Sequence, residues 1–217
     1  MGKAKINRGI YRVLSLGAGV QSTALSYLFQ NKKLENPPDC AIFADTKNEP
    51  KAVYKQLKRL KKDITVFPIY IVTSKLINLA LNPGKIPLFI KNKETGKIGM
   101  GWRQCTNDYK IKVVDRKIKE LLKYPPRARM KHHIQLILGM STDELQRLKE
   151  AKEAWKTLRY PLVDEVNYSR IDCLNYIDSL KLPAPPKSAC VFCPYRSASG
   201  WKPVSYTHLT LPTICSV

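Results

Sequence analysis

Acidic residues are scarce in this chain of 217 residues: 17 Asp and Glu stand against 38 Lys and Arg, a formal net charge of +21. Solubility alone does not require such an excess, and a strong cationic field attracts polyanions. We therefore expect a polyanionic partner, with Lys-rich solvated faces as the alternative interpretation. The cations concentrate in residues 51–62 and 110–131, which both have a helical pattern, so the charge is expected to line one rim.

Long apolar runs are also missing. A membrane-spanning helix needs about 18 consecutive apolar residues, and the chain has no such stretch. Its first residues, Met-Gly-Lys-Ala-Lys-Ile-Asn-Arg, lack the apolar centre of a secretory signal. We therefore expect a cytoplasmic protein with no membrane partner. The sequence contains no internal repeat, and its length fits one α/β domain with appendages.

Cysteines are few and irregularly spaced, with one tight pair, Cys190-Val-Phe-Cys193, among six. In a chain without a secretory segment this pattern favours metal binding or catalysis over disulfides. Cys190 and Cys193 are spaced to reach one metal, and Cys105 is the expected third member, because Arg103, two residues before it, and a following helix favour its thiolate. The set predicts a [4Fe-4S] cluster with one open iron. A zinc site completed by His132 or His133 is the alternative, as are plain reduced cysteines.

Strand-like and helix-like stretches alternate along the chain, which predicts an α/β fold with a mainly parallel open sheet and helices on both faces. The expected strands are residues 11–16, 40–44, 70–73 and 134–138. The expected helices are residues 22–33, 49–62, 74–81, 107–122, 143–158 and 169–180, the fifth starting at Ser141 as a hydroxyl cap. The prolines and glycines in residues 83–87 and 93–96 indicate a loop, which we expect to fold over a site.

Three regions differ in composition. We expect an α/β domain over residues 1–164 and a helical extension with the cysteine pair over residues 165–202. Residues 203–217 contain no charged residue. Within them, Val-Ser-Tyr-Thr-His-Leu-Thr-Leu-Pro-Thr (204–213) resembles translated read-through of a sequencing adapter. We therefore expect a non-native tail, in which His208 and Cys215 carry no functional information.

Two junctions favour nucleotide binding. Ser-Leu-Gly-Ala-Gly-Val-Gln-Ser (15–22) leads from an expected strand directly into a helix. Such a turn leaves amide groups unpaired at a helix N-terminus, where they favour phosphate, although glycine also serves turns that bind nothing. Ala-Asp-Thr-Lys-Asn-Glu-Pro (44–50) again joins a strand to a helix and places Asp45 at the carboxyl edge of the sheet, where open α/β sheets bind ligands.

Four separated stretches resemble the PP-loop superfamily, the adenine nucleotide alpha hydrolase fold, and within it the phosphoadenosine phosphosulfate (PAPS) reductase-like branch. They are the two junctions, Arg-Gln-Cys-Thr (103–106) with Tyr-Lys-Ile-Lys (109–112), and Gly-Met-Ser-Thr-Asp-Glu-Leu-Gln-Arg (139–147). The cysteine pair completes a resemblance that covers residues 11–201. It implies that residues 1–164 form a PP-loop nucleotide-binding domain that takes ATP or PAPS, with Mg.

The resemblance also implies roles for individual residues. Phosphates would contact the amides and hydroxyls of Ser15, Gly17, Gly19, Gln21 and Ser22. The typical loop reads Ser-Gly-Gly-x-Asp-Ser, so Gln21 replaces an acid, and this departure counts against standard Mg-ATP adenylation.

Further along the chain, Lys110 and Arg147 are implied as phosphate or sulfate ligands, with a solvated helix face as the alternative, above all for Lys110. Asp45 faces the same crevice. Asp143 and Glu144 are expected to cap their helix.

The implied activity is that of a PP-loop enzyme. Cys105 and Asp45 are the catalytic candidates, and Cys105, Cys190 and Cys193 would hold the cluster. The high positive charge favours ATP-dependent sulfur insertion into a nucleic acid, tRNA or DNA, over its two alternatives: PAPS reduction, and a non-catalytic nucleic-acid-binding protein with a structural zinc clip. The Glu-Cys-Gly context of the reductases is missing. Four aromatic residues could stack on bases, although packing is their expected role: Trp155, Tyr160, Tyr195 and Trp201.

Overall fold

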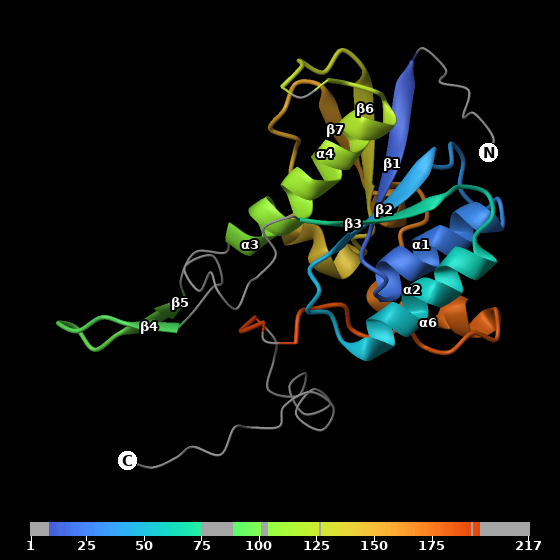
Figure 1. Cartoon of the computed structure of the whole chain (residues 1–217). Helices are drawn as coiled ribbons and strands as arrows, with labels where there is room; N and C mark the ends of the chain where they lie inside the picture. Colours follow the sequence, from blue (N-terminus) through green and yellow to red (C-terminus); the bar gives the residue numbers. More distant parts are fainter. Residues whose placement is uncertain (1–8, 75–88, 101–103, 126, 192, 196–217) are drawn as a thin grey trace.

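The main sheet is parallel throughout and doubly wound. The computed structural model describes residues 9–74, 89–100, 104–125, 127–191 and 193–195. Five strands form the sheet in the order β3-β2-β1-β6-β7 (Figure 1): β1 (Ile10–Leu16), β2 (Cys40–Asp45), β3 (Ile69–Thr73), β6 (His133–Leu138) and β7 (Lys156–Arg159). The direction of winding reverses between β1 and β6. Ligands of such sheets bind beyond the carboxyl ends of the strands at this switch point.

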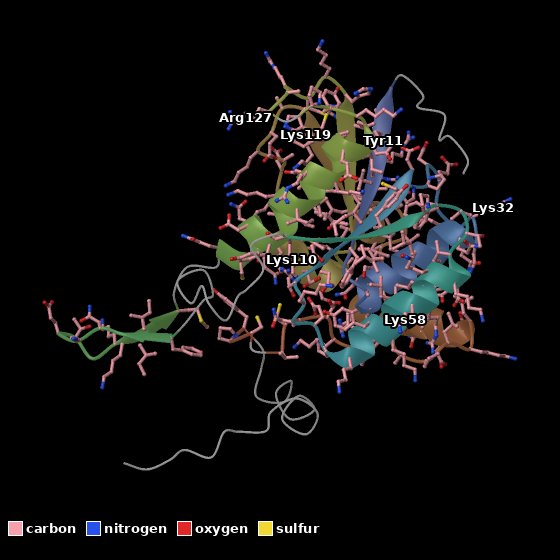
Figure 2. The ribbon with its side chains drawn as sticks, in the orientation of Figure 1. Tyr11, Lys32, Lys58, Lys110, Lys119 and Arg127 are labelled. Atoms are coloured by element: carbon pink, nitrogen blue, oxygen red, sulfur yellow. The ribbon has the colours of Figure 1, made fainter. Side chains whose placement is uncertain are left out.

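Helices cover both faces of the sheet, which confirms the predicted fold class. One face carries α1 (Val20–Gln30), α2 (Lys51–Asp63), the short α5 (Pro161–Asp164) and α6 (Arg170–Ser179). The other carries α4 (Lys112–Leu121), which continues from α3 (Gln104–Thr106) through a π-helical turn, η3 (Asn107–Ile111). Figure 2 shows Lys110 near the beginning of this helical stretch and Lys119 towards its other end.

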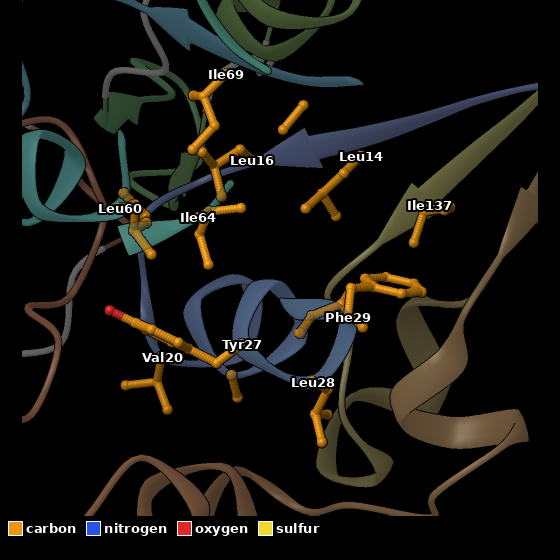
Figure 3. Packing of buried hydrophobic residues seen from close by; sticks show 14 of the residues in the cluster. Leu14, Leu16, Val20, Tyr27, Leu28, Phe29, Leu60, Ile64, Ile69 and Ile137 are labelled. Atoms are coloured by element: carbon orange, nitrogen blue, oxygen red, sulfur yellow. The ribbon is translucent and has the colours of Figure 1, made fainter. Parts of the chain in front are cut away.

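The core divides into two layers because strand side chains alternate between the faces. On β1, Leu14 and Leu16 pack with the α1 layer, whereas Val13 packs with the α4 layer. Figure 3 shows the first layer, in which Phe29 and Leu28 of α1 lie below the strand that carries Leu14. The interface between α1 and the sheet is therefore apolar beneath the turn that ends β1.

Helix α6 belongs to the same layer as α1. Its Cys173, Tyr176 and Ile177 are buried in the core, and the Tyr176 hydroxyl donates to the Tyr27 carbonyl at 3.3 Å. Ser169 caps the helix through a reciprocal pair of hydrogen bonds with Asp172. The predicted helix over residues 169–180 is thus confirmed, and burial in the core explains why Cys173 has no exposed thiol.

The predicted helix over residues 143–158 is wrong. The structure has a 3-10 helix, η4 (Thr142–Arg147), followed by an irregular segment and then strand β7. Glu144 departs from helical backbone angles, and Ser141 gives the helix no side-chain cap within the described residues. The polar and apolar residues of this segment are spaced as in a helix. The last part of the segment instead forms a strand, which pairs with β6 at the edge of the sheet.

A β-hairpin occupies the region between β3 and α3. Strands β4 (Phe89–Lys91) and β5 (Ile98–Met100) pair antiparallel, and the hairpin projects away from the body of the molecule (Figure 1). Residues 93–96 form its tip, so this part of the predicted flap does not fold over a site. Residues 83–87, the predicted helix beyond Ser74 and the tail over residues 203–217 lie outside the described residues.

Among the helices described, none combines the length and the apolar character that crossing a membrane requires.

Candidate functional site

The turn after β1 presents the start of α1 at the switch point of the sheet. Gly19 is the N-cap residue, with φ of −90° and ψ of −175°, and Thr23 makes the first helical bond to its carbonyl at 2.9 Å. The preceding amides of a helix have no partner within it. In the described structure no side chain caps this end, and no acid lies in the first turn. The arrangement suits an anion.

The backbone conformation of the turn adds to this preference for an anion. Ala18 is fully buried and has φ of +54°, a left-handed conformation that costs free energy for a residue with a side chain. A left-handed residue bends the chain sharply between the strand and the helix, and concavities of amides that bind anions are built from such bends. The Ser22 hydroxyl donates to the Gly19 carbonyl at 3.3 Å and so fixes the end of the turn.

Gly139 brings the loop after β6 against the same turn. A Cβ atom on this residue would lie 2.9 Å from the Ser22 amide nitrogen and 3.0 Å from its Cα. Only glycine fits such an approach to rigid backbone. The resemblance stretch 139–147 therefore contributes its glycine to the site, a role that sequence reasoning had not assigned.

Gln21 joins three elements through its amide. Its Nε2 donates to Glu144 Oε2 at 3.2 Å and to Ser141 Oγ at 3.5 Å, and its Oε1 accepts from Arg170 Nη1 at 3.1 Å. An acid at position 21 would set a second negative charge beside Glu144. The network therefore explains why this loop departs from the aspartate of the typical PP-loop.

The acids of η4 do not cap their own helix, contrary to expectation. Asp143 accepts the Arg170 amide at 2.5 Å and so caps α6, while Glu144 pairs with Gln21 and Arg147. The Arg147 side chain is 55% exposed. Its role as a phosphate or sulfate ligand stays a prediction.

The carboxylate of Asp45 stabilises the turn after β2. The residue is buried, and its Oδ1 accepts from the Lys47 amide at 2.7 Å and from the Tyr54 hydroxyl at 2.8 Å. Its Oδ2 lies 3.0 Å from Lys47 Nζ. Burial and the bond to Asp45 raise the pKa of Tyr54. The carboxylate is thus engaged in fixing the loop, and its catalytic role stays a prediction.

Glu49 is a site residue that sequence reasoning missed. Its side chain is 1% exposed, Oε1 lies 3.3 Å from Lys110 Nζ, and Oε2 has no hydrogen-bond partner among the described residues. A buried carboxylate with one unpaired oxygen is costly to maintain. The only signal was its place in the stretch 44–50, immediately before α2. Lys110 is therefore partly buried in an ion pair instead of lying on a solvated face.

The cysteine-pair segment crosses this edge of the sheet. Cys190 Sγ lies 3.2 Å from Thr46 Oγ1, and the Val191 amide donates to the Asn48 carbonyl at 2.8 Å. Burial, followed by the Glu49 charge, raises the pKa of Cys190, while Thr46 and Lys110 act in the opposite direction.

The same segment covers the turn after β1. A Cβ atom on Gly19 would lie 3.4 Å from Ser188 Cβ, and one on Gly17 would lie 3.9 Å from Ser188 Oγ. Residues 186–191, the strap, therefore lie over the ends of both β1 and β2. No sequence signal located the strap, because its path depends on a loop far along the chain.

The predicted metal ligands are not gathered into one group. Cys105 is half-buried in α3, and Cys193 donates its amide to the Cys190 carbonyl at 3.0 Å. Within the described ranges, no three His, Cys, Asp or Glu side chains are arranged to hold a metal ion. His132 and His133 lie at the amino end of β6, the opposite edge from Cys190, so neither completes a zinc site with it.

Two cavities lie at that amino edge. One of about 370 Å³ is lined by Gly9, Ile10, Tyr11, Arg12 and Asp39. The other, of about 280 Å³, is lined by residues 129–133 with Ala154 and Trp155. At the carboxyl edge the strap occupies the space over the turn.

Comparison with known proteins gives structural likeness only. No family model and no curated protein matches the chain. The chain is similar to a solved structure, the U34-tRNA thiolase NcsA from Methanococcus maripaludis with its [4Fe-4S] cluster, at 16% identity and a TM-score of 0.44. The match covers 94% of this chain and 66% of the thiolase chain. A likeness of this degree carries no argument about activity.

The structure itself supports the resemblance at the level of fold. A parallel, doubly wound sheet has its switch point where the glycine-containing turn enters α1, and the four resemblance stretches follow β1, β2 and β6 or surround η3. The structure thus confirms the predicted α/β fold with a parallel, doubly wound sheet.

Proposed function

We propose that the chain is a nucleotide-using enzyme of the PP-loop type, which binds ATP or PAPS at the turn formed by residues 15–22. The observation that carries the proposal is the uncapped start of α1 at the switch point between β1 and β6. Unpaired amides and the helix dipole favour phosphate there.

The residues around the turn supply the contacts. The amides that follow Gly17 and Gly19 would donate hydrogen bonds to phosphate oxygens, with the Ser15 and Ser22 hydroxyls beside them. Gln21 would position the loop through Glu144 and Arg170. Arg147 would offer a forked pair of donors at the rim once an anion replaces Glu144 as its partner.

The strap must form part of the nucleotide site or move from it. Ser188 lies within contact distance of the positions where side chains on Gly17 and Gly19 would stand. A phosphate that approaches these amides therefore meets the Ser188 hydroxyl, which can donate a further hydrogen bond.

The three cysteines are not gathered in the described structure, so as they stand they do not fit an iron-sulfur cluster or a zinc ion. Two thiols are instead available to chemistry at the carboxyl edge: the partly exposed Cys105, and Cys190 beside Thr46 and Glu49. Of these, Cys190 is placed within reach of charged groups that set its protonation.

For the reaction, we propose ATP-dependent sulfur insertion into tRNA or DNA. The net charge of +21 supports a polyanionic substrate. PAPS reduction is a second candidate, favoured by a thiol, Cys190, near the proposed phosphate site. The third is a nucleic-acid-binding protein without catalysis. It is favoured because the Asp45 carboxylate already accepts hydrogen bonds from the Lys47 amide and the Tyr54 hydroxyl.

Three assays on the same preparation distinguish these candidates. Sulfur insertion predicts ATP consumption that rises with added tRNA or DNA, and loss of that stimulation in Gly19→Val. PAPS reduction predicts thiol-dependent release of sulfite. The non-catalytic alternative predicts neither activity and predicts stoichiometric zinc. Iron and zinc analysis of anaerobically purified protein measures the metal content. Absence of both activities in anaerobic protein would overturn the enzyme proposal.

A further inference from the structure

Helix α4 carries a row of cations along one face. Lys112, Arg116 and Lys119 follow one another at spacings of four and three residues, which places them on the same side of the helix, and Lys123 lies two residues beyond its end. The opposite side, with Val114 and Ile118, is buried against the sheet. Three acids belong to the same stretch and offset part of the charge: Asp108, which pairs with Lys112 at 2.7 Å, Asp115 and Glu120.

The row runs from one edge of the sheet to the other. At its beginning, Lys110 reaches Glu49 at the carboxyl edge, and at its far end Tyr124 contacts His132 at the start of β6. The helical stretch from α3 to the end of α4 is about 27 Å long at the usual rise. Figure 2 shows Lys110, Lys119 and Arg127 in succession along this side of the molecule.

The row ends at the pocket of about 280 Å³. Its lining contains the cationic side chains Arg129 and Lys131, two histidines, His132 and His133, and the ring of Trp155. The Tyr124 hydroxyl accepts from the amides of Lys131 and His132 at 2.9 and 3.1 Å, so the backbone of the pocket wall is fixed.

The Lys156 ammonium group lies against the Trp155 ring. Lys156 Nζ lies 4.6 Å from the centre of the ring, is 3% exposed, and pairs with Asp115 at 2.8 Å. A ring supported in this way by a buried cation presents a preorganised surface for stacking. Trp155 packs partly against the core layer of α4, and its exposed part lies in the pocket wall.

We propose that this pocket and the α4 row form the docking surface for a single-stranded polynucleotide. The cations would contact successive phosphates, and one unpaired base would stack on Trp155 in the pocket. A duplex keeps its bases stacked inside and offers none to such a pocket. The inference deepens the proposed function, on which it rests for the role of the nucleic acid as substrate, and it locates that substrate along α4.

Binding of a labelled 12-nucleotide single-stranded RNA, and of the matching DNA, followed by fluorescence anisotropy, tests the proposal. The double variant Arg129→Ala with Lys131→Ala should raise Kd about tenfold and reduce the slope of log Kd against log salt by about 1.4. Lys58→Ala with Lys61→Ala removes the same charge from exposed positions on α2 and should change Kd less than twofold. Trp155→Leu should raise Kd about tenfold with little change in the salt slope.

Urea unfolding of each variant separates a folding defect from a binding defect. If Trp155→Leu does not fold, the affinity of the double variant at Arg129 and Lys131 decides whether the surface binds the oligonucleotide. Equal effects of the two double variants, tighter binding of a duplex, or no binding of either oligonucleotide would overturn the docking surface. Titration of the same proteins with ATP and PAPS keeps the two proposals distinct. Oligonucleotide binding that depends on the pocket, without nucleotide binding, would overturn the enzyme alone.

Discussion

Gly139 is a residue at which one added methyl group disturbs the site. In Gly139→Ala the new Cβ meets backbone atoms of Ser22, which cannot rotate away as a flexible side chain would. Overpacking of this kind costs about 1–3 kcal/mol. We expect that loss in urea unfolding, together with weaker nucleotide binding. Gly9→Ala is the matched control, because no atom lies within 4 Å of its Cβ position, and equal stability of both variants would contradict the close approach.

Charges around Cys190 predict opposite effects of two substitutions. Glu49 raises the pKa of this thiol, and Lys110 lowers it. Glu49→Gln should therefore lower the pKa and increase the thiolate fraction at neutral pH, whereas Lys110→Ala should do the reverse. The rate of alkylation at Cys190 against pH, followed by peptide mass spectrometry, measures both. An unchanged profile in either variant would show that these charges do not reach the thiol.

Sequence reasoning succeeded for residues whose position follows from the end of a strand. Asp45 and Gln21 lie at the carboxyl edge because β2 and β1 end beside them, and short apolar runs identify those strands. It failed for Glu49 and Ser188. Burial of a carboxylate and the path of the strap depend on packing between distant segments, which local patterns do not encode.

At the scale of elements, Lys156 joins α4 to β7. The lysine is buried, and its ammonium group pairs with Asp115 of α4 at 2.8 Å and with Glu153 at 3.5 Å. Burial raises the pKa of Asp115 despite this pairing. Lys156→Met would leave the carboxylate without its partner, which costs about 3 kcal/mol for a buried pair.

Urea unfolding measures this loss, and Lys152→Met, an exposed lysine in the preceding segment, is the control. Equal free energies of unfolding for the two variants would show that this ion pair does not stabilise the fold. The same lysine explains why β7 escaped prediction: a strand of Lys-Thr-Leu-Arg has no apolar alternation, and its cation is buried only because α4 supplies an acid.

At the scale of the whole molecule, two buried thiols predict loss of stability in alkali. Burial raises the pKa of Cys40 to about 11 and that of Cys173 to about 12, from an ordinary value of 9.0. The folded chain therefore holds protons that the unfolded chain has lost between about pH 9 and pH 11. Stability is fully present below pH 9 and falls as pH rises through this window, by about 2 kcal/mol for each thiol.

Urea unfolding at pH 8 and pH 10.5 checks this loss. The double variant Cys40→Ala with Cys173→Ala should show a smaller difference between the two pH values, even if its stability at pH 8 is lower. A difference as large as that of the unmodified chain would assign the alkaline loss to other groups, such as Tyr11, whose pKa burial also raises.

The proposed nucleotide site lies at one edge of the sheet and the cationic pocket lies at the other, with α4 between them. The central claim is that the amides at the start of α1 bind a nucleotide. Calorimetric titration with ATP and with PAPS measures it most directly. The account predicts that at least one binds, and that Gly19→Val weakens it at least about tenfold while Gly9→Val does not. No heat of binding at millimolar concentration, or equal affinity in the two variants, would contradict it.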